Sequence, residues 1–139
     1  MVLRVLQPIQ MSAAEPIRST NLDCEIALIS SPESKPLQQM IDYSRWHVTE
    51  LPDLEAARTG LADGDCPIVI CGTRDWRRIL EIARSSVRPP SVVVVAPRAD
   101  NFEWLQVLDA GAHYLPLDQL GAGQLFSLLN LLWRSWHKD

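Results

Sequence analysis

The segment Ser91-Val-Val-Val-Val95 indicates the fold more directly than any other part of this sequence. Four consecutive valines show no alternation with polar residues, so a strand made of them is expected to be buried on both faces. Residues 25–29 and 67–71 are two further apolar runs of strand length. The sequence therefore predicts a parallel sheet that is covered by helices on both sides.

Helical segments alternate with these strands along the chain. Apolar residues recur at helical spacing after each strand, and Ser, Asp, Pro and Gly mark the helix ends. We expect strands at 25–29, 46–50, 67–71, 91–95 and 113–115, and helices at about 32–44, 54–61, 74–86, 102–109 and 118–137. This alternation predicts a flavodoxin-like, doubly wound α/β fold: a five-stranded parallel sheet of order 2-1-3-4-5 with five helices.

Length and composition are those of one ordinary globular domain. The chain has 139 residues, of which 47% are hydrophobic and 22% charged, and a domain usually contains about 100–150 residues. Residues 1–22 are interpreted as a loosely attached N-terminal arm, with Met11 as an alternative to Met1 as the natural start. Residues 23–139 are interpreted as the domain.

Charge and hydropathy argue against nucleic-acid and membrane partners. The formal net charge is −4 and no Lys/Arg run exceeds two residues, whereas nucleic acid and acidic lipid attract clustered cations. No segment approaches the roughly 18 apolar residues of a membrane span. The N-terminus also lacks the long apolar region of a secretion signal. We therefore expect a cytoplasmic protein.

The reactive residue types are scattered. Cys24, Cys66 and Cys71 lack Cys-x-x-Cys spacing, and the three histidines form no constellation with Ser, Asp or Cys that would suggest catalysis. Zinc sites usually reveal themselves through ligand spacing. We expect no metal, no cofactor and no enzymatic activity.

Two segments late in the chain resemble response-regulator receiver domains. They are Val93-Val-Val-Ala-Pro-Arg-Ala-Asp100 and Val107-Leu-Asp-Ala-Gly-Ala112; the second is similar to the Ala-Leu-x-Ala-Gly-Ala segment before the fifth strand of receivers. The ending Leu131-Leu-Trp-Arg-Ser-Trp136 is similar to stand-alone bacterial receivers with paired tryptophans in the last helix. The resemblance covers residues 24–138. It implies a signalling domain of the two-component or phosphorelay class.

The resemblance also implies a phosphorylation pocket, from which this chain departs at every position. In the family, two acidic residues after the first strand hold Mg²⁺, and an Asp after the third strand accepts the phosphoryl group. A Ser or Thr after the fourth strand and a Lys after the fifth contact that group. The corresponding positions here are Ser30, Ser31, Gly72 (or Cys71 if the alignment shifts by one), Ala96 and Asp118. We therefore expect a degenerate receiver, or pseudo-receiver, that accepts no phosphoryl group and acts through protein–protein contact.

Two alternatives stay open at the same strand ends. The loop Ser30-Ser-Pro-Glu-Ser34 is interpreted as a helix cap, but it could also hold an anion or nucleotide in a flavodoxin-like binding domain. Asp75 is a conceivable substitute acceptor, although a carboxylate at a helix start more often caps the helix or interacts with its dipole.

The last two predicted helices carry more apolar residues than one core-facing side needs. In the last helix the sheet-facing stripe is formed by Leu125, Leu128, Leu129, Leu132 and Trp136. Phe126 and Trp133 lie outside this stripe, and Trp104 and Val107 form a second stripe on the preceding helix. We expect these four residues to contact a protein partner of unknown identity, most simply a second copy in a homodimer. The alternative is packing against the N-terminal arm.

Overall fold

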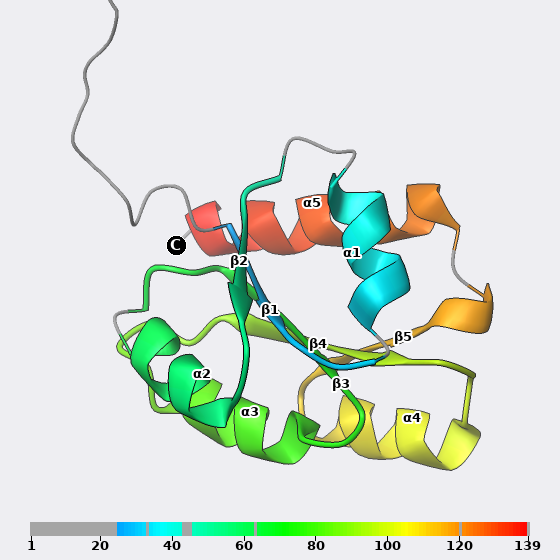
Figure 1. Cartoon of the computed structure of the whole chain (residues 1–139), viewed down its shortest axis with the longest axis horizontal. Helices are drawn as coiled ribbons and strands as arrows, with labels where there is room; N and C mark the ends of the chain where they lie inside the picture. The colour runs from blue at the N-terminus through cyan, green and yellow to red at the C-terminus, as the bar shows by residue number, and fades with distance from the viewer. Residues whose placement is uncertain (1–24, 33, 43–45, 63, 120, 139) are drawn as a thin grey trace, which may run out of the picture.

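The computed structural model describes residues 25–32, 34–42, 46–62, 64–119 and 121–138. The predicted N-terminal arm, Cys24 and Glu33 lie outside these residues. One parallel sheet runs through the described part of the chain in the order β2-β1-β3-β4-β5 (Figure 1). Its strands are β1 (Ile26–Ile29), β2 (Val48–Leu51), β3 (Ile68–Gly72), β4 (Ser91–Ala96) and β5 (His113–Pro116). The predicted fold class and strand order are confirmed.

Helices cover the sheet on both sides, as expected from the crossover rule. In the described part of the chain the α-helices are α1 (Ser34–Asp42), α2 (Leu54–Leu61), α3 (Trp76–Arg84), α4 (Asn101–Asp109) and α5 (Ala122–Lys138). Figure 1 shows α1 and α5 on one face of the sheet and α2, α3 and α4 on the other. None of these helices has both the length and the apolar character needed to cross a membrane.

The valines of β4 explain why the domain has two apolar layers. Val92 and Val94 belong to the core under α2, α3 and α4, whereas Val93 and Val95 belong to the core under α1 and α5. All four side chains are buried. Because successive side chains of a strand point to opposite faces, the uninterrupted valine run supplies both cores at once.

Glycines mark the C-terminal end of α4 and the start of α5. Gly111 has a φ of 89°, and its N–H donates to the carbonyl of Leu108 at 3.0 Å; this left-handed conformation is a common way for a helix to end. The last helix begins later than predicted, because Leu125 donates to the carbonyl of Gly121 and α5 starts after that glycine. A short 3₁₀ helix, η2 (Leu117–Gln119), precedes it.

Candidate functional site

The loops that follow β1 and β3 enclose a hollow of about 230 Å³. Parallel strands end at the same edge of a sheet, so the residues after these two neighbouring strands meet there. The hollow is lined by Ile29, Ser30, Ser31, Pro32, Cys71, Gly72, Thr73, Arg74 and Asp75. Three of the five predicted pocket positions, Ser30, Ser31 and Gly72, are therefore brought together.

The residues that line this hollow do not fit the Mg²⁺ implied by the receiver resemblance. Among the described residues that line it, Asp75 carries the only carboxylate, and Mg²⁺ prefers several oxygen ligands of which carboxylates supply the charge. Within the described residues no group of three or more His, Cys, Asp or Glu side chains could hold a metal ion. The hydroxyls and the Arg74 guanidinium suit a small anion better than a divalent cation.

Asp75 occupies the N-cap position of α3 without capping it. Its backbone carbonyl accepts from Ile79 at 3.0 Å, but its side chain makes no capping hydrogen bond. By contrast, the Asp53 side chain caps α2 and the Asp100 side chain caps α4. Of the two roles expected for Asp75, the side-chain cap is therefore not formed, the interaction with the helix dipole stays a prediction, and the carboxylate lies beside the hollow.

Ala96 and Asp118 lie at the same edge of the sheet but do not line the hollow. Ala96 is buried at the end of β4 and pairs with Pro116 of β5. Asp118 lies in η2, and its carboxylate accepts a hydrogen bond from the backbone N–H of Ala99 at 3.2 Å. Asp118 thus ties the segment after β5 to the loop after β4.

A hydrogen-bond network around Tyr114, which the sequence did not predict, organises the loop after β4. The Tyr114 hydroxyl donates to Glu103 at 2.9 Å and lies 3.3 Å from the backbone N–H of Asp100, which donates to it. Burial, and then the hydrogen bond and charge of Glu103, raise the pKa of Tyr114 to about 12. The Trp104 ring packs 5.2 Å from the tyrosine ring. A tyrosine within an apolar strand is the sequence feature that indicates such a network, because a buried Tyr hydroxyl requires a hydrogen-bond partner.

The predicted interface residues differ in their exposure. Val107 is 0% exposed and belongs to the core, so its assignment to an interface is wrong. Trp104, Phe126 and Trp133 are partly buried and pack against the two cores. The exposed large apolar side chains of α4 are instead Phe102, Leu105 and Leu108. Since α4 is apolar on most sides, its pattern could not show which stripe faces the sheet.

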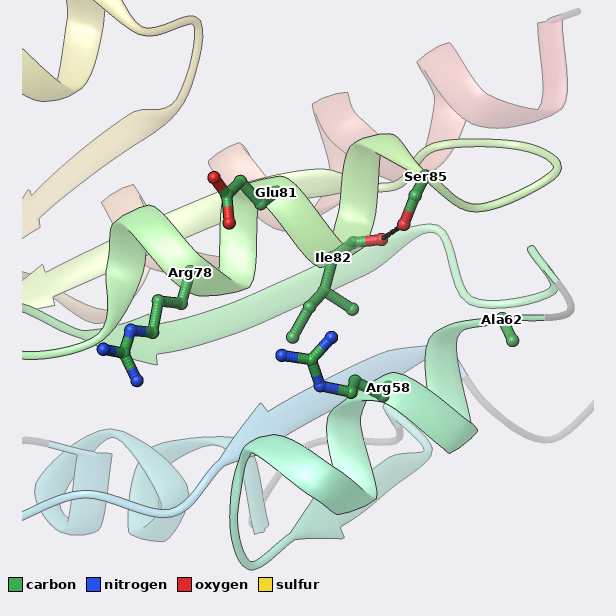
Figure 2. A pocket seen from close by; sticks show the side chains of 6 residues that line it. All are labelled: Arg58, Ala62, Arg78, Glu81, Ile82 and Ser85. Atoms are coloured by element: carbon green, nitrogen blue, oxygen red, sulfur yellow. Dashed lines mark hydrogen bonds between the residues drawn. The ribbon is translucent and has the colours of Figure 1, made fainter.

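A second hollow, of about 540 Å³, lies between α2 and α3 (Figure 2). It is lined by Arg58, Ala62, Arg78, Glu81, Ile82 and Ser85, and Figure 2 shows Arg58 reaching from α2 toward Ile82. The Ser85 hydroxyl donates to the Ile82 carbonyl at 2.8 Å. No pattern in the sequence indicates this hollow, because it depends on how two helices pack.

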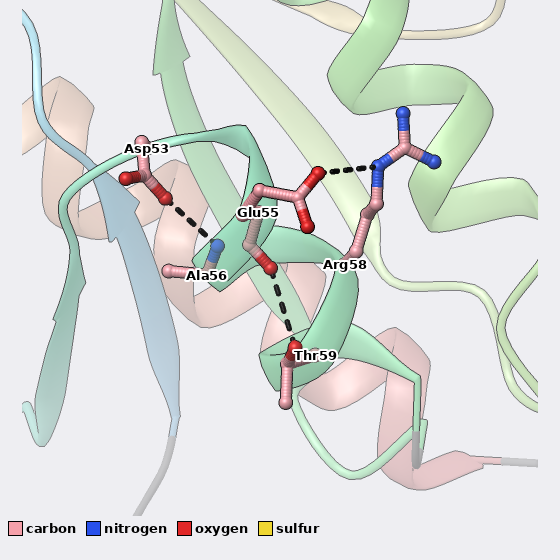
Figure 3. Close-up of polar contacts among 5 residues, drawn as sticks. All are labelled: Asp53, Glu55, Ala56, Arg58 and Thr59. Atoms are coloured by element: carbon pink, nitrogen blue, oxygen red, sulfur yellow. Dashed lines mark hydrogen bonds and ion pairs between the residues drawn. The ribbon is translucent and has the colours of Figure 1, made fainter.

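The polar contacts of Arg58 and its neighbours are local to α2 (Figure 3). Glu55 pairs with Arg58 at 3.7 Å, and the Thr59 hydroxyl donates to the carbonyl of Glu55. Both partners of the ion pair are largely exposed, so it contributes little to stability. The described residues that line this hollow bring together two arginines, a glutamate and a serine hydroxyl that already donates to a backbone carbonyl.

Together, the strand order, the two helical layers and the hollow at the carboxyl ends of β1 and β3 define a flavodoxin-like α/β domain. No protein-family model matches the sequence, and neither does any curated protein sequence. Solved structures do match it, and they show that the chain has the fold of response-regulator receiver domains. Because the sequence identities are below one quarter, these structural likenesses show a shared fold and nothing more.

Three solved structures illustrate the likeness. The signal receiver domain of a Luxo repressor protein from Vibrio parahaemolyticus has a TM-score of 0.67 and 13% identity, over 82% of this chain and 92% of that chain. A CheY-like receiver domain from Methanospirillum hungatei JF-1 has a TM-score of 0.63 and 12% identity, and the match covers 83% of this chain and 98% of that chain. The pilus assembly protein CpaE from Caulobacter crescentus CB15 has a TM-score of 0.53 and 23% identity, and the match covers 78% of this chain and 92% of that chain.

Proposed function

We propose that this domain is a receiver-like signalling module that accepts no phosphoryl group, catalyses no reaction and acts by binding other proteins. The observation that carries the proposal is the composition of the hollow after β1 and β3. Two serines and a glycine stand there where receivers place metal-binding and phosphorylated carboxylates. Glycine has no side chain to phosphorylate, and neutral hydroxyls are poor Mg²⁺ ligands.

The charge after β5 supports the same proposal. Receivers pair the phosphoryl group with a lysine, whereas this chain carries Asp118, whose carboxylate already accepts from Ala99. An anion at this position repels a phosphoryl group whereas the lysine of receivers attracts it, although Asp118 is exposed and does not line the hollow. The departures therefore oppose phosphorylation independently.

We expect such a domain to transmit a signal through contact with a protein. We place the contact surface on α4 and α5, where Trp104, Phe126 and Trp133 keep part of their surface exposed. A homodimer is the simplest form of such contact. The likeness to CpaE, which is named as a pilus assembly protein, favours a role within a larger assembly. A cytoplasmic location belongs to the same proposal.

Thermal melting with and without millimolar Mg²⁺ tests whether the hollow after β1 and β3 binds Mg²⁺, which this proposal says it does not. A ligand present at one hundred times its Kd adds roughly 2.7 kcal/mol to stability, which gives a visible shift in Tm. We expect the same Tm in Mg²⁺ and in NaCl of equal ionic strength. If Mg²⁺ raises the Tm and the Asp75→Asn variant loses that rise, the hollow binds metal and the proposal fails.

A second candidate is a small-anion or nucleotide site in the same hollow. The observation that favours it is the position of Thr73 and Arg74 beside Ser30 and Ser31, because hydroxyls and a guanidinium bind anionic oxygens well. FMN and inorganic phosphate, added in the same melting experiment, separate the two candidates. A rise in Tm that Ser30→Ala removes would favour the anion site; an unchanged Tm favours the contact module.

A further inference from the structure

The hollow between α2 and α3 brings together arginines from two helices. Arg58 belongs to α2 and Arg78 to α3, and Figure 2 shows both guanidinium groups extending into the space between these helices. The carboxylate of Glu81 points away from them in the same view. A carboxylate placed between α2 and α3 would therefore meet two cations from opposite walls, and charge-assisted hydrogen bonds of this kind are strong.

The Arg78 side chain is available to an external anion. Its neighbours on α3 already have intramolecular partners: Arg77 stacks on the Trp76 ring at 4.4 Å, and Arg84 donates to the carbonyl of Ala110. The Arg78 side chain is exposed and has no hydrogen-bond or ion-pair partner among the described residues. Its five N–H donors match the geometry of carboxylate oxygens.

Arg58 is held loosely by its own partner. Its Nε lies 3.7 Å from the carboxylate of Glu55, and the two side chains are 62% and 88% exposed. Exposed ion pairs contribute little because water and salt screen them. Figure 3 shows the contact at Nε, with the two terminal nitrogens of the guanidinium pointing away from Glu55. These terminal nitrogens can bind a second carboxylate end-on.

The shape of the hollow favours a segment of chain over a small ligand. Its volume is about 540 Å³, and every described residue that lines it is exposed except Ile82. Small-molecule sites usually bury most of the surface of their ligand, whereas an extended peptide needs contact along one side. Ile82, which is 9% exposed, offers an apolar contact for the aliphatic part of an acidic side chain.

The charge of α3 differs in sign from that of the whole protein. This helix carries three arginines and one glutamate, a net charge of +2, whereas the whole chain has a net charge of −4. A long polyanion such as nucleic acid would be repelled by the acidic remainder of the protein. A short acidic segment meets only the local field, which extends about 8 Å in physiological salt. The local charge therefore favours an acidic peptide.

We propose that the hollow between α2 and α3 is a docking site for an acidic peptide segment of a partner protein, with Arg58 and Arg78 each binding a carboxylate. The proposal rests on the contact function above and adds a second surface with a stated partner chemistry. It is separate from the surface on α4 and α5 and from the hollow after β1 and β3. Because both arginines are exposed, a short peptide binds with a Kd on the order of 1 mM.

Two-dimensional NMR of the isotope-labelled whole chain tests the site. The probe is a capped peptide of about six residues that alternates glutamate and alanine, so that its carboxylates lie on one face of the extended chain, ~7 Å apart. We expect saturable shifts of backbone amides in α2 and α3. The same peptide with glutamine in place of every glutamate should cause none, because it has no charge to pair with the arginines.

Variants at four positions separate direct contact from general attraction. Arg58→Gln and Arg78→Gln should each raise the Kd about threefold, as expected for one exposed ion pair. Arg77→Gln is the charge-matched control on the same helix; its guanidinium stacks on Trp76, so the Kd should change less than about 1.5-fold. Glu81→Gln removes a carboxylate that lines the hollow and should lower the Kd. The NMR spectrum of each variant shows that it is folded.

Several results would overturn the proposal. One is the absence of shifts at about 10 mM peptide, and another is shifts confined to the loops after β1 and β3. Equal losses in Arg77→Gln and Arg78→Gln would indicate diffuse attraction, and the same shifts with inorganic phosphate at equal concentration would indicate a small-anion site. Failure here is distinct from failure of the contact function on α4 and α5, because that surface includes no arginine of α2 or α3.

Discussion

Tyr114 is the residue that links the last strand to the helix before it. Its hydroxyl donates to Glu103 of α4 and accepts from the N–H of Asp100, the residue that caps α4. Its ring lies beside that of Trp104. A buried hydroxyl that is fully hydrogen-bonded positions its neighbours, because breaking any of these contacts leaves a polar group without a partner. The loop after β4 is therefore positioned by side chains as well as by the sheet.

The raised pKa of Tyr114 gives a test at the scale of this residue. The unfolded state loses the tyrosine proton near pH 10, whereas the folded state holds it until about pH 12. This contribution to the free energy of unfolding is therefore complete below pH 10 and is lost as the pH rises toward 12. We expect the stability of the wild type to fall more steeply from pH 9.5 to 11.5 than that of Tyr114→Phe, measured by urea unfolding. Parallel pH profiles would show that Tyr114 titrates as an ordinary tyrosine.

At the scale of the helix, the starts of α3 and α4 differ although both have an aspartate at the N-cap position. The Asp100 side chain accepts from the N–H groups of Phe102 and Glu103. Asp75 makes no such bond and lies instead beside the hollow. A helix start leaves several N–H groups without internal partners, so a side-chain cap normally adds stability there. The uncapped start of α3 leaves the Asp75 carboxylate to other interactions.

The two aspartates form a matched pair for mutation. Asp100→Ala should lower the free energy of unfolding by about 1 kcal/mol, because it removes a cap that serves two N–H groups. Asp75→Ala should cost less than half as much, since only its interaction with the helix dipole is lost. Chemical denaturation of both variants measures the difference. Equal losses would mean that the Asp75 side chain caps α3 in solution.

At the scale of the whole molecule, the fold was predictable because it depends on periodicity. The valines of β4 and the regular alternation of strands and helices were enough to predict the sheet order and both layers. The receiver resemblance implied the grouping of Ser30, Ser31 and Gly72, and the topology accounts for it, since neighbouring parallel strands end together. These features need no knowledge of side-chain geometry.

The details that the sequence did not reveal depend on the directions of side chains. Val107 was placed at an interface because Trp, Leu, Val and Phe occur on several sides of α4, and such a helix has no polar face to fix its orientation. The bond between Tyr114 and Glu103 joins a strand to a helix and has no sequence pattern. The hollow between α2 and α3 likewise depends on helix packing.

The central claim is that the domain transmits its signal without phosphorylation, and intact-mass spectrometry after incubation with acetyl phosphate and Mg²⁺ tests it most directly. A receiver domain with the full set of acidic residues, treated in parallel, shows that the reagent is active. We predict that the mass of this protein stays unchanged, because Gly72 and the two serines offer neither an acceptor nor a metal site. A Mg²⁺-dependent gain of one phosphoryl group, lost in Asp75→Asn, would contradict the account.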